Sequence, residues 1–234
     1  MNNIDWKAFE TNMSLMLINM KLESLPTDLE KLVDKSYELA DNAEKDLKKE
    51  SEKTFADIEK MPEVIEETSD GEPFCEKNWI ESQAEDYFCE QNGIIELYNK
   101  SINLMLINFF VETFEGLKKN VGDKLKKEKM ETTTLDRLVY APADDDMLKV
   151  RLINNCIKHN DSKVSDDLSR KFPGEYTKND EIDINPELVY ELLEITVNAI
   201  RKFNKLFNQY YHDWCFVSAG KTNVFFSTKV LYYQ

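Results

Sequence analysis

Glycine and proline are scarce in this chain, and that scarcity constrains the fold more than any other feature. Only six of each occur among 234 residues, and both residue types interrupt helices, glycine by its backbone entropy and proline by its missing donor. An apolar content of 41% and an aromatic content of 11% are typical of a folded globular protein. The sequence therefore predicts an all-α protein built from long helices.

Apolar periodicity places the first two helices. Apolar residues recur at helical spacing over residues 4–25, and Pro26 is expected to end that helix. Residues 27–30 read as a capping box, which starts a second helix that reaches about residue 61. An acidic loop is expected over residues 62–73.

Two more long helices follow. Helix is expected to resume near Glu76 and to run to about Gly116, with a second half that is apolar nearly all round and thus central in the fold. Asn185 and Pro186 form a helix start, with asparagine as the cap and proline at the first helical position. The helix that begins there carries apolar residues at helical spacing to about Tyr210.

Composition divides the chain into three regions. We expect an acidic N-terminal helical region over residues 1–75, a helical bundle over 76–212 and an aromatic, β-prone tail over 213–234. Residues 164–184 are expected to form either a long ordered loop or a small β-hairpin, and a short strand pair is expected near residues 215–233, where aromatic and β-branched residues gather.

The net charge of −15 limits the possible partners. It repels nucleic acid over most of the surface, so any nucleic acid must bind at a local basic face. Basic residues cluster once, at the end of the expected central helix, and there they serve either to complement the helix dipole or to contact phosphates. The cluster comprises Lys118, Lys119, Lys124, Lys126, Lys127 and Lys129.

The remaining composition points to a cytoplasmic protein without a cofactor. Cys75, Cys89, Cys156 and Cys215 lie far apart, as expected of reduced thiols rather than metal ligands. The first residues lack the basic and apolar regions of a signal peptide. The most apolar run, residues 102–111, is too short to span a bilayer, so no membrane association is expected. Phosphate-loop, dinucleotide-binding, zinc-protease and serine-hydrolase motifs are absent from the sequence.

One polar stripe stands out in this acidic chain. At 100° per residue, Arg151, Asn155 and His159 share one face of a short helix, with Asn154 and Lys158 beside them and no acid on that face. The opposite arc is expected to face a core and holds Leu148, Leu152, Ile153, Cys156 and Ile157.

The ends of this helix allow a purely structural interpretation. Asp144 to Asp146 are expected to provide its N-cap and an acidic first turn. Asn160, Asp161 and Ser162 are expected to stop it. In this interpretation His159 and Asn160 are only a helix-end cap, since histidine favours the negative end of the helix dipole and asparagine tolerates left-handed backbone.

The stripe also suits metal-independent RNA cleavage. His159 can move a proton near neutral pH, Arg151 can stabilise the transition-state charge, and Asn155 can orient the phosphate. About 12 Å along the helix axis separates Arg151 from His159. Two antiparallel copies would bring each histidine towards the other chain's arginine.

The segment from Arg151 to Asn160, late in a helical chain and followed by a loop and a long helix, resembles the motif helix of the HEPN superfamily. That superfamily consists of helical bundles, many of them ribonucleases of toxin–antitoxin, CRISPR and phage-defence systems. Its motif places an arginine four to six residues before a histidine, and active members usually form the site between two protomers. Here seven residues separate the two, one more than the pattern has. The resemblance covers roughly residues 95–212.

The resemblance implies a homodimeric endoribonuclease or toxin in antiviral defence or a toxin–antitoxin pair, with a possible cognate antitoxin or defence-system partner. Arg151, Asn155 and His159 would form its catalytic site. RNA would be held by Lys158, Asn160, Lys118, Lys119, Lys124, Lys126 and Lys127. The alternative is a non-catalytic binding or adaptor module whose stripe binds a nucleotide or an acidic segment. A purely structural helical protein is the third possibility.

Overall fold

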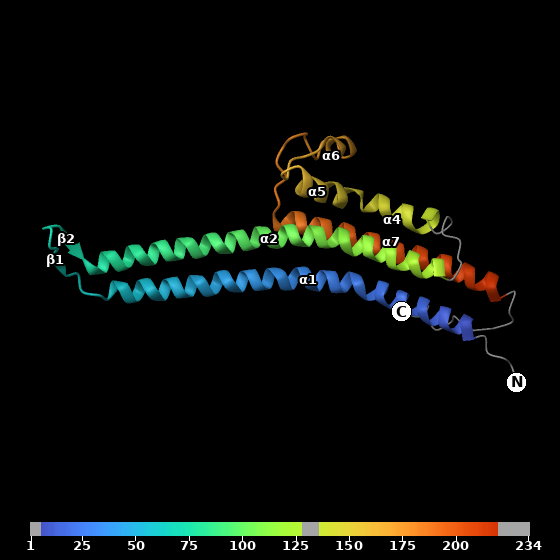
Figure 1. Cartoon of the computed structure of the whole chain (residues 1–234), viewed down its shortest axis with the longest axis horizontal. Coiled ribbons are helices and arrows are strands. Elements are labelled where there is room, and N and C mark those ends of the chain that lie inside the picture. The colour runs from blue at the N-terminus through green and yellow to red at the C-terminus, as the bar shows by residue number, and fades with distance from the viewer. Residues whose placement is uncertain (1–5, 128–135, 220–234) are drawn as a thin grey trace. The chain divides into compact units, whose positions relative to one another are not determined.

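Helices make up nearly all of the part of the chain that the structure describes. The computed structural model describes residues 6–127 and 136–219 (Figure 1), and over these the prediction of an all-α fold is confirmed. None of the helices described combines the length and apolar character that a membrane crossing requires.

The chain forms two compact units. Unit 1 comprises residues 1–29, 107–183 and 187–234, and unit 2 comprises residues 30–106 and 184–186. The division falls inside the two longest helices. Composition changes at residues 75 and 212 do not indicate it, because helical periodicity continues across both points of division.

Helix α1 (Trp6–Glu59) runs without interruption through Pro26, so the prediction that Pro26 ends the first helix is wrong. A proline inside a helix costs about 3 kcal/mol, because it removes one backbone hydrogen bond and crowds the preceding turn. Pro26 is itself buried, and it lies on the same helical stripe as the buried Leu22 and Leu29. Burial along this stripe offsets the cost of the proline.

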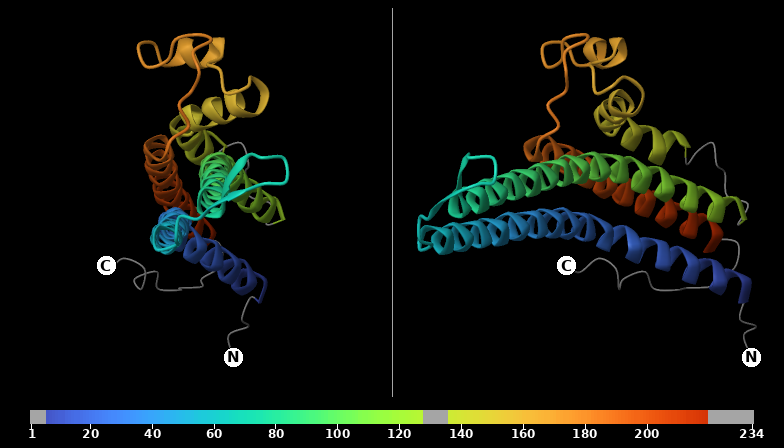
Figure 2. Two further views of the ribbon diagram at one scale, coloured as in Figure 1. Left: turned by 90° about the vertical axis from the view of Figure 1, so that its left-hand side faces the viewer. Right: turned by 60° about the vertical axis from the view of Figure 1, so that its left-hand side comes forward.

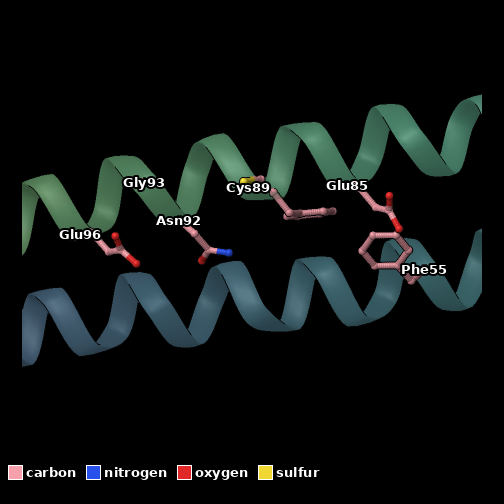
Figure 3. A pocket seen from close by; sticks show the side chains of 7 residues that line it. Phe55, Glu85, Cys89, Asn92, Gly93 and Glu96 are labelled. Carbon is pink, nitrogen blue, oxygen red and sulfur yellow. The ribbon is translucent and has the colours of Figure 1, made fainter.

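Unit 2 is an antiparallel helical hairpin made from residues 30–59 of α1 and residues 76–106 of α2 (Glu76–Lys127). Side chains pair Tyr37 with Asn103, Glu44 with Asn99 and Phe55 with Phe88. The α1 residue number rises from pair to pair while the α2 residue number falls, so the two helices are antiparallel. Figure 3 shows the two helices around Phe55. Helix α2 begins at Glu76, as predicted.

A short β-hairpin joins the two helices of unit 2. Strands β1 (Ile65–Glu67) and β2 (Pro73–Cys75) are antiparallel, with Ile65 opposite Cys75. At the turn, Thr68 Oγ1 accepts a hydrogen bond from the Glu72 backbone at 3.1 Å. Gly71 adopts a φ of 83°, which favours glycine. The sequence predicted only an acidic loop here, since three-residue exposed strands leave no apolar alternation.

The β-hairpin elements predicted from the sequence concern two other segments, residues 164–184 and 215–233. Residues 164–184 contain helix α6 (Asp166–Lys171) and one isolated bridge between Lys163 and Glu181. The Val164 backbone N–H donates to the Asp180 carbonyl at 2.8 Å, so of the two predicted alternatives the segment forms the ordered loop, closed by a bridge. Of residues 215–233, the first five belong to a helix, and the rest lie outside the described residues.

The core of unit 1 is aromatic. Helix α7 (Pro186–Ala219) starts at Pro186 as predicted and packs against α2 through Phe203, which meets Phe114 edge-on at 6.2 Å between ring centroids. Tyr140 stacks on Phe203 at 5.5 Å. Tyr140 ends a single π-helical turn, η1 (Asp136–Tyr140), which leads directly into helix α4 (Ala141–Asp146).

Candidate functional site

The polar stripe lies on helix α5 (Leu148–His159), which follows α4 after the single residue Met147. The aspartates 144–146 belong to α4, so the prediction that they cap the α5 helix is wrong. Met147 is fully buried, and its side chain makes no capping hydrogen bond. Pro142 lies in the first turn of α4, where proline is tolerated, and helix therefore begins one element earlier than expected. Helices α5 and α6 lie side by side in both views of Figure 2.

The buried face of α5 is rotated relative to the prediction. Ile153 and Cys156 are buried as predicted, and Val150 and Asn154 join them. The other predicted core residues, Leu148, Leu152 and Ile157, are half-buried. Asn154 was expected beside the polar stripe. Its buried Oδ1 has no hydrogen-bond donor within the described part of the chain, which is costly for a polar atom.

Arg151 is held by two acids that come from other helices. Its Nη2 contacts the Asp144 carboxylate of α4 and lies 2.7 Å from Glu115 Oε1 of α2. The guanidinium also lies over the ring of Phe114, 5.9 Å from its centroid. The Arg151 side chain is only 25% exposed. The stripe is free of acids on its own helix, but acids from α2 and α4 neutralise its arginine.

Lys118 shares the same acids. Its Nζ donates to both carboxylate oxygens of Asp144 at 2.8 and 2.9 Å and lies 3.4 Å from Glu115. Its side chain is 19% exposed and stands 5.9 Å from the centroid of the Phe114 ring. Two cations and two carboxylates thus form a network of zero net charge, which we call the Asp144 network.

The last turn of α5 is different, because its polar side chains are exposed. Asn155, Lys158 and His159 are all open to solvent, and among the described residues none of them has an ion pair or side-chain hydrogen bond. Lys163, in the turn that follows, is exposed as well. We call Asn155, Lys158 and His159 the α5 end face.

Asn160 has a structural task in the same turn. Its Nδ2 donates to the Lys163 carbonyl at 2.6 Å, and its backbone N–H donates to the Cys156 carbonyl at 3.0 Å. Asp161 and Ser162 then adopt left-handed backbone with φ of 48° and 60°. The prediction that residues 160–162 stop the helix is confirmed, and a role of Asn160 in RNA binding stays a prediction.

The lysine cluster is not a uniform patch. Lys118 belongs to the Asp144 network, whereas Lys119 is exposed. The side chains of Lys124, Lys126 and Lys127 lie outside the described residues. Contact of this cluster with RNA stays a prediction.

Sequence reasoning missed Lys149, the most strongly engaged lysine of α5. It is 13% exposed, contacts Glu175, lies 2.6 Å from Glu191 Oε1, and stands 5.4 Å from the ring centroid of Tyr176. Burial lowers the pKa of Lys149, but hydrogen bonds to the two glutamates raise it more, so the net pKa lies above the ordinary value. Burial also raises the pKa of Tyr176, although nearby Lys149 opposes that shift. Nothing in the local pattern signals Lys149, since its partners lie 26 and 42 residues later.

This geometry can bind an anion at the α5 end face, and it does not bring Arg151 and His159 to one point within a chain. Seven residues stand between them, so they lie about 12 Å apart along the axis, and Arg151 is paired near the start of the helix. Within residues 6–127 and 136–219, no group of three His, Cys, Asp or Glu side chains is placed to hold a metal ion. No protein-family model, curated protein or solved structure matches the chain. The HEPN resemblance therefore depends on the residues of the motif alone.

Proposed function

We propose that unit 1 is a non-catalytic, HEPN-like binding module that takes a phosphate-bearing ligand, with RNA as the ligand to test first, at the α5 end face. The observation that carries the proposal is the pairing of Arg151 with Asp144 and Glu115. Two carboxylates already neutralise the charge of this guanidinium. It would therefore do little to stabilise the negative charge that develops on a phosphorane transition state. The end face lies two turns further along and is not part of that network.

The end face suits a phosphate. Lys158 supplies an exposed ammonium, the Asn155 amide can donate to a phosphate oxygen, and a ring nitrogen of His159 can donate another hydrogen bond. Asn155 and His159 are four residues apart and therefore lie one above the other on the helix. A ligand bound here would be attracted by few charges, so its affinity should be modest and sensitive to salt.

Fluorescence polarisation with a labelled single-stranded RNA tests the proposal. Lys158→Glu should weaken binding about tenfold or more and should lower the slope of log K against log salt by about one or two. Lys205→Glu, at an exposed position on α7, is the matched control and should leave binding unchanged. Equal loss in both variants, or no binding by wild type in 50 mM salt, would contradict the proposed site.

A ribonuclease is the second candidate, because the exposed His159 is free to move a proton. Its test is incubation of a mixed RNA pool with wild type and His159→Ala in excess chelator, with circular dichroism on both proteins. Cleavage by wild type alone would replace the binding module by the enzyme and would place its arginine in a second copy. Under the binding-module proposal neither protein cleaves, while both still bind RNA.

A further inference from the structure

Helix α2 carries a second row of heptad positions in unit 2 besides the one that faces α1. The row, which we call the α2 seam, has alternating spacings of four and three residues over nearly four heptads. It consists of Ile80, Ala84, Tyr87, Gln91, Ile94, Tyr98, Ser101 and Met105. Not one of the eight is charged, although 32% of the whole chain is. Such spacing is the pattern of a coiled-coil contact.

Four large side chains of the α2 seam are exposed, whereas Ile80 is half-buried and lines a hollow with Ile58 of α1 and with Met61. Tyr87 is 46%, Ile94 51%, Tyr98 49% and Met105 62% exposed. Beside the seam, Trp79 and Leu97 are exposed as well. An apolar strip of this length is unusual on a soluble surface and marks a contact with another molecule.

The α1 helix occupies a different side of α2. Phe88 and Asn99, which contact Phe55 and Glu44 of α1, each follow a seam residue directly. One residue corresponds to about 100° around a helix. A helix with two apolar rows about 100° apart has the pattern of a member of a four-helix bundle, which contacts two neighbours. In unit 2 only one of those neighbours is present.

We propose that the second neighbour is α2 of a second copy of this chain, packed antiparallel so that two helical hairpins form a four-helix bundle. In that direction each seam residue of one copy lies opposite a seam residue of the other. The two residue numbers of every such pair add to 185. Tyr87 then meets Tyr98 of the second copy, and the small Ala84 meets the small Ser101. Ile80 meets Met105, and Gln91 meets Ile94, so that each layer combines the two kinds of heptad position.

Charged residues do not interrupt the seam. Over residues 80–105 the nearest charged residues are Glu81 and Glu90, which flank the seam on opposite sides, each about 80° from its centre line. In the antiparallel pair the two Glu90 positions lie five residues apart, about 7.5 Å along the axis.

The area of the α2 seam determines how strongly two copies should associate. Its 26 residues span about 39 Å, and with a helix width of about 10 Å the footprint is about 400 Å² on each copy. A standard stable interface buries about 800 Å² on each partner. We therefore expect a reversible dimer with a dissociation constant in the micromolar range. The inference concerns unit 2 and does not rest on the ligand proposed for unit 1.

Sedimentation equilibrium of the full chain from about 1 to 300 µM tests the association. The average mass should rise with concentration towards twice that of the chain. Ile94→Asp places two charges in the centre of the dimer and should weaken association at least about 100-fold. Leu39→Asp is the matched control. It places the same charge at an exposed leucine of α1 in unit 2, and this variant should associate like wild type. Circular dichroism checks the folding of both variants.

A chain that stays monomeric at 300 µM overturns the inference, and so does a dimer that Ile94→Asp leaves intact. Spin labels test the direction. With a single label at Ile80→Cys, in a background with the native cysteines replaced by serine, antiparallel copies place the labels about 38 Å apart along the axis. A distance near the helix diameter, about 10 Å, would overturn the antiparallel arrangement.

Discussion

Asp144→Asn should destabilise unit 1 through two cations at once. The Asp144 carboxylate accepts hydrogen bonds from Lys118 at 2.8 and 2.9 Å and pairs with Arg151. The side chains involved are 19% to 29% exposed. Exposed ion pairs contribute at most about 1 kcal/mol, whereas breaking a fully buried pair costs about 3–5 kcal/mol. Because Glu115 remains as a partner for both cations, we expect a loss of about 1–3 kcal/mol.

Hydrogen exchange of the α5 backbone amides measures this loss of stability. Because the chain has two compact units, a measurement on α5 reports on unit 1 alone. A loss of 1–3 kcal/mol corresponds to exchange about 5- to 150-fold faster. Asp145→Asn on the same helix is the control, since Asp145 is exposed and forms no ion pair with the described residues. Its α5 amides should exchange within about twofold of wild type. Equal exchange in the two variants would refute the assignment of Asp144 as the centre of the network.

Two further predictions concern the packing of unit 1. The raised pKa of Lys149 means that its stabilising contribution is complete below the unfolded value of 10.5 and is lost as the pH rises towards the folded value. Urea unfolding between pH 9 and 12 should therefore show a steeper loss of stability in wild type than in Lys149→Met, and parallel curves would count against it. Phe203 is fully buried between Phe114 and Tyr140, so Phe203→Ala should cost about 3–5 kcal/mol of unfolding free energy. A loss below about 1 kcal/mol in urea titration would show that these rings are not the core.

The fold class could be predicted from the sequence because it depends on local properties. Scarce glycine and proline, helical periodicity and the Asn185–Pro186 start act within a few residues of one another. The prediction at Pro26 was wrong because the free-energy cost of proline in a helix is a local property, whereas the burial that offsets this cost comes from tertiary contacts.

The candidate site could be predicted only in part. Spacing correctly placed Arg151, Asn155 and His159 on one side of a helix, but the acids that neutralise Arg151 come from other helices, Glu115 of α2 and Asp144 of α4. The same holds for Lys149, whose glutamates lie in other segments of unit 1. Ion pairs between elements leave no periodic signal, so only the three-dimensional arrangement distinguishes a neutralised arginine from an available lysine.

The continuity of α1 and α2 has a consequence for the order of folding. The pairs that join the two helices in unit 2 start at Glu59 with Lys77, only 18 residues apart, and widen to Tyr37 with Asn103, 66 residues apart. The hairpin can therefore close from its turn outward, and each new pair encloses only a little more chain, so the loop entropy is lost in small steps. The Phe114–Phe203 contact of unit 1 joins residues that are 203 − 114 = 89 positions apart, further than any of these pairs. Unit 2 should thus be the first part of the chain to fold, with the pairs of unit 1 that are most distant in sequence closing last.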